Sequence, residues 1–200
     1  MTEIEPIALF DMDGTLCDYE KGLKEALNSL KSPYESDFLG RVNDNAPQYM
    51  RTRADLIRSS RNWWKNLDKF QLGWDILAIA KSLGFKIMIL TQGPRRNPES
   101  WAGKKMWIDK HLGKDTDITI TRDKGIVYGK VLVDDFPEYI KRWLSWRDRG
   151  LVIMPANEEN KDFTHPQVIR YDGTNLEQVI KAMILARNRK AKEHVDYSKI

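Results

Sequence analysis

The sequence predicts an α/β protein: a Rossmann-like, doubly wound parallel sheet with helices on both faces and a small helical cap inserted after the first strand. Short apolar, β-branched runs alternate with segments of helical periodicity, as in strands joined by helical crossovers. The runs are apolar throughout, as strands covered on both faces are. One interval, residues 17–66, breaks the alternation because it holds no strand-like run and is polar, charged and aromatic.

Each expected strand is followed by a turn signal or by a helical pattern. Strands are expected at 7–10, 85–90, 118–121, 131–133, 151–154 and 168–171. Apolar residues spaced three or four apart indicate helices over 72–80, 101–112, 139–146 and 176–184. In sheets of this kind ligands bind at the carboxyl ends of the strands, so the residues that follow the strands are the first candidates for a site.

The domain organisation follows from the interrupted alternation. We expect a hydrolase-like core over 1–16 and 67–186, a helical cap over 17–66 and a basic C-terminal tail over 187–200. Charge is uneven across the cap: residues 1–40 carry 3 basic and 9 acidic side chains, whereas residues 41–65 carry 6 and 2. A lid with this basic half is suited to attract an anion.

The overall charge at first suggests a nucleic-acid binder. The 200 residues hold 33 Lys and Arg against 29 Asp and Glu, giving a net charge of +4 and a pI near 9.0. Residues 181–200, with six basic and two acidic side chains, account for the whole excess. Binding of nucleic acid is therefore possible through the tail but not favoured. With 41% hydrophobic and 31% charged residues, the composition is globular rather than disordered, collagenous or membrane-embedded.

Cysteines and histidines are few, and the first ten residues carry no basic side chain, which restricts both the expected compartment and the expected chemistry. The first ten residues carry acids where a signal peptide needs basic residues, and their apolar run is too short to span a bilayer, so we expect a cytoplasmic protein with no membrane segment. The single cysteine, Cys17, excludes an intrachain disulfide and a cysteine-built zinc site. With only three histidines, carboxylates must carry most of any catalysis.

The strongest chemical signal is the pair of acids that follows the strand at 7–10. Asp11 and Asp13 are separated by one residue, which places both carboxylates at the carboxyl edge of the sheet, and Gly14 permits a sharp turn. Two acids this close repel each other unless a cation or a shared proton intervenes. A calcium loop would need Gly at its sixth position and Glu at its twelfth, where this chain has Leu16 and Gly22. A solvated acidic turn is the remaining alternative.

Two further signals stand at strand ends. Asp134 and Asp135 follow the strand at 131–133, and carboxylates from two strand ends form an all-oxygen site whose natural occupant is Mg²⁺. Thr91 and Gln92 follow the strand at 85–90, where a hydroxyl and free backbone N–H groups are able to hold phosphate oxygens. On its own, the acid pair would more often be a turn or a helix cap, and the threonine an ordinary turn residue.

These signals, in this order, resemble the haloacid dehalogenase-like hydrolase superfamily, most of whose members are phosphatases. Within it, the stretches around Thr91, at 104–108, at 121–124 and at 131–135 are similar to the 5'(3')-deoxyribonucleotidase family. The resemblance implies that Lys104 is a phosphate ligand and that Arg122 and Lys124 lie near the phosphate. Gln92 stands where the family usually has serine.

The resemblance also implies a mechanism. Asp11 attacks phosphorus to form an aspartyl-phosphate, and Asp13 protonates the leaving group and then deprotonates the attacking water. A halide leaving group needs no proton, so Asp13 favours phosphoester cleavage over dehalogenation. Mg²⁺ is expected on the Asp11 carboxylate, the Asp13 backbone carbonyl and Asp135, with Asp134 acting indirectly or through water. Lys104 and Thr91 are expected to stabilise the transferring phosphoryl group.

The expected substrate is a small phosphorylated molecule, a nucleoside or deoxynucleoside monophosphate. Trp63 and Trp64, near the end of the cap, are candidates for stacking on the nucleobase, although two adjacent tryptophans beside Leu67 are equally suited to pack the cap on the core. Three alternatives remain open: a phosphatase of nucleic-acid ends, a phosphatase of another small metabolite, and a non-catalytic binding protein on the same scaffold.

Overall fold

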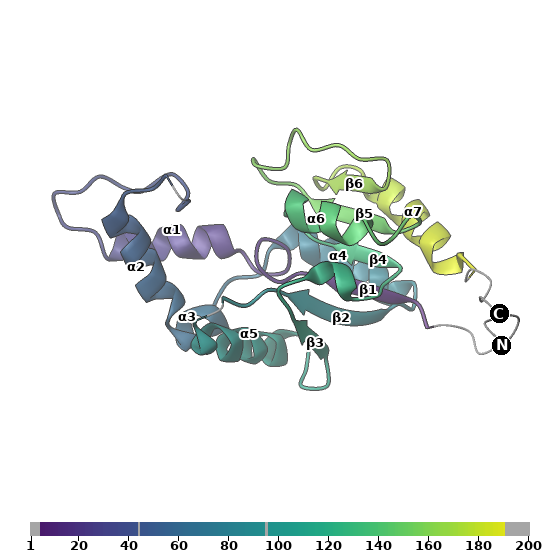
Figure 1. The fold of residues 1–200 in the computed structure, drawn as a ribbon, viewed down its shortest axis with the longest axis horizontal. Coiled ribbons are helices and arrows are strands. Elements are labelled where there is room, and N and C mark those ends of the chain that lie inside the picture. The colour runs from purple at the N-terminus through teal and green to yellow at the C-terminus, as the bar shows by residue number, and fades with distance from the viewer. Residues whose placement is uncertain (1–4, 44, 95, 191–200) are drawn as a thin grey trace, which may run out of the picture.

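The sheet is the centre of the molecule (Figure 1). In the computed structural model, which describes residues 5–43, 45–94 and 96–190, six parallel strands run in the order β3-β2-β1-β4-β5-β6. The strands are β1 (Ile7–Phe10), β2 (Lys86–Thr91), β3 (Asp117–Ile120), β4 (Val131–Val133), β5 (Leu151–Pro155) and β6 (Val168–Tyr171). The predicted α/β fold with a parallel sheet is confirmed.

The helices of the described residues lie between these strands in the chain, except for the last one, which follows β6. They are α1 (Tyr19–Ser29), α2 (Gln48–Arg58), α3 (Arg61–Lys65), α4 (Gln71–Ser82), α5 (Pro98–His111), a short 3₁₀ helix η1 (Lys124–Ile126), α6 (Pro137–Leu144) and α7 (Leu176–Asn188). None of them combines the length and the apolar character that a bilayer-spanning helix requires. The basic tail predicted at 187–200 overlaps the end of α7, and residues 191–200 lie outside the described part of the chain.

The strand order reverses direction at β1, which pairs with β2 on one side and β4 on the other. In an open parallel sheet, this reversal opens a crevice at the carboxyl ends of the two strands where the order switches. The residues that follow β1 and β4 therefore meet in that crevice.

β2 ends one residue later than predicted, because Thr91, a β-branched residue, still pairs with Ile120 of β3.

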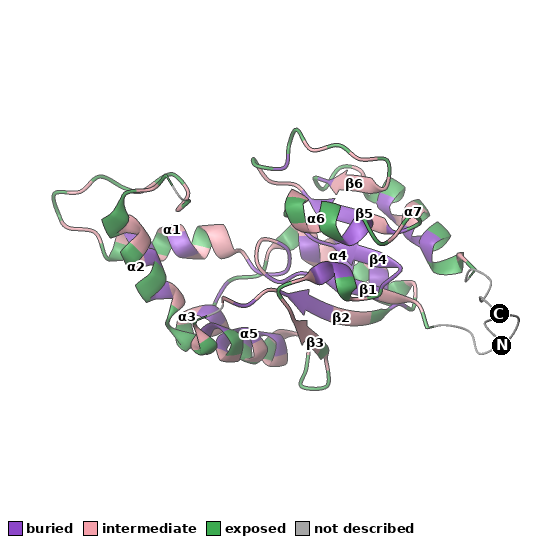
Figure 2. Ribbon diagram, viewed as in Figure 1, coloured by how far each residue is buried: buried purple, intermediate pink, exposed green. Residues whose placement is uncertain are grey.

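Two apolar clusters cover the two faces of the sheet, which explains why the central strands are apolar throughout. Successive residues of β1 alternate between them: Ala8 and Phe10 belong to one cluster and Leu9 to the other. The first cluster includes residues of α4, α5 and α7, and the second those of α6. Figure 2 shows the central strands as the most continuously buried part of the chain.

Helices α1, α2 and α3 occupy the interval after β1, as predicted, and α1 and α2 project beyond one end of the sheet (Figure 1). Below, "the cap" means these helices and the residues that connect them. The cap has a small apolar cluster of its own, formed by Leu23, Leu27, Ala54 and Ile57. It joins the core mainly through α3 and α5, where Gly103 is needed: a Cβ there would lie 2.5 Å from the Cβ of Trp64.

Candidate active site

Three carboxylates converge where β1 and β4 end. The backbone N–H of Asp11 donates to the carbonyl of Val133 at 2.8 Å, so Asp11 continues the pairing of the two central strands. One carboxylate oxygen from each of Asp11, Asp134 and Asp135 lies within 4.8 Å of the others. The sequence prediction that two strand ends bring their acids together therefore holds in the structure.

A tight turn after β1 brings Asp135 against residues 11–15, called the first motif below. Gly14 has a φ of 72°, in the left-handed region, and a Cβ at this position would lie 2.5 Å from Oδ2 of Asp135. The buried Thr15 hydroxyl donates to Oδ1 of Asp135 at 3.2 Å. Glycine is thus required here both for the backbone conformation and for the approach of a carboxylate.

Lys124 lies between two of the carboxylates. Its Nζ is 2.6 Å from Oδ2 of Asp134 and 2.9 Å from Oδ1 of Asp11, and the residue is only 3% exposed. Burial by itself would lower the pKa of Lys124, but Asp11 and Asp134 outweigh it and raise that pKa above its ordinary value. The sequence predicted Lys124 beside the phosphate; the structure shows it bound to the acids, and a phosphate contact stays a prediction.

Lys104, from α5, is the second buried lysine of the site and is 1% exposed. Its Nζ donates to Oδ2 of Asp13 at 2.5 Å, to the Thr91 hydroxyl at 3.1 Å and to the carbonyl of Gln92 at 2.7 Å. Burial raises the pKa of Asp13, and the charge of Lys104 opposes that rise. The structure therefore joins the first motif, the end of β2 and α5 at one ammonium group.

The residues present fit a divalent cation. Burial, together with the neighbouring charges of Asp134 and Asp11, raises the pKa of Asp135 well above its ordinary value. Oδ1 of Asp11 is buried, and Nζ of Lys124 lies 2.9 Å from it in an ion pair. When all four carboxylates, including Asp13, are ionised, they carry two more negative charges than Lys104 and Lys124 neutralise. An all-oxygen donor set with this excess suits Mg²⁺.

Arg122 and Gln92 lie side by side after β3 and β2. Nη1 of Arg122 donates to the carbonyl of Gly93 at 3.3 Å. With its oxygen toward the guanidinium, the Gln92 amide accepts from Arg122 Nη1 at 3.0 Å and donates to the hydroxyl of Tyr139. In this orientation Gln92 contacts Arg122 at the edge of the site. Phosphate binding by either residue stays a prediction.

The two tryptophans are placed differently. Trp64 is 3% exposed within the core cluster, and its indole N–H donates to the carbonyl of Arg58 at 2.7 Å. Trp63 is half-buried and donates to the carbonyl of Gly22 at 3.4 Å. Packing of the cap on the core is thus the role the structure favours for Trp64, whose ring lies 4.9 Å from Nζ of Lys104. Stacking on a base stays a prediction.

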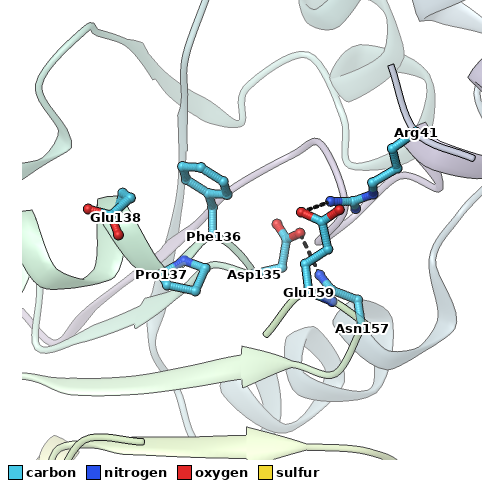
Figure 3. A pocket seen from close by; sticks show the side chains of 7 residues that line it. All are labelled: Arg41, Asp135, Phe136, Pro137, Glu138, Asn157 and Glu159. Carbon is cyan, nitrogen blue, oxygen red and sulfur yellow. Dashed lines mark hydrogen bonds and ion pairs between the residues drawn. The ribbon is translucent and has the colours of Figure 1, made fainter. Parts of the chain in front are cut away.

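Sequence reasoning missed the turn after β5. A pocket of about 250 Å³ opens beside Asp135 (Figure 3). Asn157 and Glu159 of this turn line it together with Arg41 of the cap. The sequence Asn-Glu-Glu-Asn at 157–160 is typical of any polar loop. Its position in the chain could have indicated it: the turn follows β5, which pairs with β4, so it lies at the same edge of the sheet as Asp135.

Comparison with known proteins identifies the family of the chain. The family model described as 5' nucleotidase, deoxy (pyrimidine), cytosolic type C protein matches residues 5–188. The human cytosolic-type 5'(3')-deoxyribonucleotidase is 28% identical over 144 residues, covering 64% of this chain and 69% of its own. The mouse mitochondrial 5'(3')-deoxyribonucleotidase is 26% identical over 144 residues, covering 65% and 64%.

Among solved structures, a family IA, variant 3 hydrolase of the haloacid dehalogenase type from Entamoeba histolytica aligns with a TM-score of 0.48 at 17% identity, covering 88% of this chain and 99% of its own. The family model spans nearly all of the described residues, from before β1 to the end of α7. The chain therefore belongs to the cytosolic type C 5'-nucleotidase (deoxy, pyrimidine) family and is an enzyme of the phosphatase class.

Proposed function

We propose that the protein is a Mg²⁺-dependent phosphomonoesterase that acts on nucleoside monophosphates through an aspartyl-phosphate on Asp11. Deoxypyrimidine nucleotides are the first substrates to test, since the family description names them. The observation that carries the proposal is the convergence of Asp11, Asp134 and Asp135 at one strand edge, next to an Asp13 held by a buried lysine.

The nucleophile is fixed by the sheet. Asp11 is 5% exposed and follows the central strand, so its carboxylate is held in place by the pairing of β1 with β4 rather than by a mobile loop. The positive charge of Lys124, 2.9 Å away, reduces the repulsion between this carboxylate and an approaching phosphate. Attack by a carboxylate oxygen divides the hydrolysis into formation and breakdown of an acyl phosphate.

Asp13 is suited to act as general acid and then general base. Burial raises its pKa, which helps the carboxyl group hold the proton that a leaving alkoxide requires. Lys104 binds Oδ2 of Asp13 and the Thr91 hydroxyl together, so it sets the direction of that carboxyl group. When phosphate occupies the site, Lys104, Thr91 and Arg122 offer donors to its oxygens.

The cation would be held by the carboxylates of Asp11 and Asp135 and by the backbone carbonyl of Asp13. Asp134 accepts from Lys124 at 2.6 Å with one oxygen and from the N–H of Phe136 at 3.0 Å with the other, so it would act on the cation indirectly, by holding Lys124 or through water. When bound, Mg²⁺ supplies positive charge between the anionic nucleophile and the anionic phosphate.

The test is phosphate release by purified wild type and Asp11→Asn with Mg²⁺. The substrates are ribo- and deoxyribonucleoside 5'- and 3'-monophosphates, sugar phosphates and phosphorylated oligonucleotides. We expect hydrolysis of mononucleotides by the wild type and none above background by Asp11→Asn. Asp109→Asn, an equivalent change at the far end of α5, should retain full activity.

Each other outcome has a definite meaning. Turnover by Asp11→Asn would exclude the proposed nucleophile. A preference for phosphorylated oligonucleotides would favour a phosphatase of nucleic-acid ends, and a preference confined to sugar phosphates would exclude the nucleotide substrate while leaving the mechanism intact.

A further inference from the structure

The turn at residues 157–160 holds Asp135 at two points. The side-chain amide of Asn157 donates to Oδ2 of Asp135 at 3.0 Å. The side-chain amide of Asn160 donates to the backbone carbonyl of Asp135 at 3.0 Å and to that of Pro155 at 2.9 Å, and Asn160 is fully buried. With Thr15 on Oδ1, the Asp135 carboxylate has a donor on each oxygen. Its orientation is therefore set from two sides, by Thr15 after β1 and by the turn at residues 157–160.

The turn is closed by its own side chains. Oδ1 of Asn157 accepts from the N–H of Glu159 at 2.9 Å and from the N–H of Asn160 at 3.0 Å. Oδ1 of Asn160 accepts from the N–H of Asn157 at 3.0 Å and from Nε of Arg170 at 3.0 Å. Since the same Asn157 side chain binds both Glu159 and Asp135, a displacement of the turn at Glu159 changes the position of the Asp135 donor.

The cap is attached to this turn. Arg41 of the cap forms an ion pair with Glu159 and a second one, at 3.2 Å, with Glu20 of α1. Figure 3 shows the Arg41–Glu159 contact and the Asn157–Asp135 contact in the same pocket. A separate ion pair between cap and core, Arg61 with Glu99 at 2.7 Å, joins α3 to α5 and involves no residue of the turn.

We propose that the turn at residues 157–160 couples the cap to the cation site, with Asn157 as a positioning residue for Asp135. The inference rests on the proposed cation site. Loss of a residue that donates a hydrogen bond to a metal-binding carboxylate typically weakens metal affinity about 10- to 100-fold. The Arg41–Glu159 pair acts on that carboxylate only through the turn, so its effect is smaller. The position of the cap and the affinity for the cation are then linked.

The experiment measures Mg²⁺ affinity by isothermal titration for the wild type, Asn157→Ala, Arg41→Ala and the double variant. We expect Asn157→Ala to weaken binding about 10-fold or more. Arg41→Ala should weaken it about two- to fivefold, because the pair is half-exposed, with side-chain exposures of 28% and 50%. In the Asn157→Ala background, Arg41→Ala should have little further effect on Mg²⁺ affinity, since the donor through which the turn reaches the Asp135 carboxylate is gone. The matched control is Arg61→Ala, which cuts the other cap–core ion pair and should leave Mg²⁺ affinity unchanged.

A second variant and a second readout separate positioning from folding. Asn157→Ser keeps a hydroxyl that can accept from the turn's N–H groups but is too short to reach Asp135, so it should weaken Mg²⁺ binding with an unchanged unfolding temperature. The activity lost in either Asn157 variant should return as the Mg²⁺ concentration is raised, which a general loss of structure would not allow.

The outcomes are distinct. Absence of Mg²⁺ binding by the wild type would overturn the proposed cation site itself. Mg²⁺ binding by the wild type with unchanged affinity in Asn157→Ser, or equal losses for Arg41→Ala and Arg61→Ala, would overturn the coupling alone.

Discussion

Replacing Lys124 by methionine removes the buried charge that lies between Asp11 and Asp134. At an effective dielectric constant of about 20, its contacts at 2.6 and 2.9 Å each contribute roughly 6 kcal/mol of attraction before desolvation is subtracted. The cost of removing the charges from water offsets most of that attraction. When only Lys124 is removed, the two carboxylates stay buried and their desolvation cost remains. We therefore expect Lys124→Met to lower the free energy of unfolding by about 3–5 kcal/mol at pH 8 without divalent cations.

The loss should depend on pH in a definite direction. Burial raises the pKa of Asp134 from 3.8 to about 6 even with Lys124 opposing the rise, and without Lys124 that pKa rises further. A carboxyl group with a raised folded-state pKa binds a proton that the unfolded chain releases, so the folded state gains stability as the pH falls. The difference between Lys124→Met and the wild type should shrink by at least about 1 kcal/mol between pH 8 and pH 5.

Urea unfolding in EDTA at the two pH values measures both effects. Arg142→Met is the control, because it breaks an exposed ion pair with Asp123, whose pKa is lowered by the hydrogen bond from Arg142 and which stays charged over this range. Arg142→Met should lower the free energy of unfolding far less than Lys124→Met does, and by the same amount at pH 8 and pH 5. A loss below about 1 kcal/mol for Lys124→Met at pH 8, or an equal loss at both pH values, would refute the reasoning.

Four further outcomes are expected. In single-turnover measurements of leaving-group release, Asp13→Asn should slow the reaction of a nucleotide by about 10²–10⁴ but that of p-nitrophenyl phosphate much less, because p-nitrophenolate leaves without a proton; equal losses in this first step would contradict the acid role. Gly14→Ala should cost about 1–3 kcal/mol in urea unfolding through its positive φ and also weaken Mg²⁺ binding by displacing Asp135; wild-type affinity would contradict the steric argument. Trp64→Ala should cost about 3–5 kcal/mol in the same assay, and a loss under about 1 kcal/mol would exclude its packing role. Mg²⁺ at 100 times its Kd should add about 2.7 kcal/mol to the unfolding free energy, an increase that EDTA abolishes.

The sheet could be predicted from the sequence because a buried parallel strand is a continuous apolar run. β1 and β4 begin and end where the runs do, and the acids that follow them meet because the two strands are neighbours. The helix starts were harder to place. α5 begins at Pro98, before its apolar pattern, because the side chain of Asn97 accepts from the N–H of Ser100 and caps it.

The partners of the site residues could not be predicted. Which acid a lysine binds depends on side-chain packing, and the sequence gives no reason to place Lys124 on Asp11 and Asp134 rather than on a phosphate. The role of Asn157 could not be predicted for a different reason. Its amide makes contacts that any turn asparagine makes, and only the strand order shows that Asp135 lies beside it.

The position of β1 in the middle of the sheet also governs how the chain is made. Of the six strands of the sheet, β1 is synthesised first, yet its partners, β2 and β4, come more than seventy residues later in the sequence. Synthesis of the roughly 120 residues from Phe10 to Val133 takes about 6–25 s, and during that time an apolar strand lacks at least one neighbour. The cap helices, whose contacts are local, are able to form meanwhile. The strand that precedes Asp11, the proposed nucleophile, is therefore exposed to misassociation during translation, and its protection by a chaperone should improve the yield of folded protein.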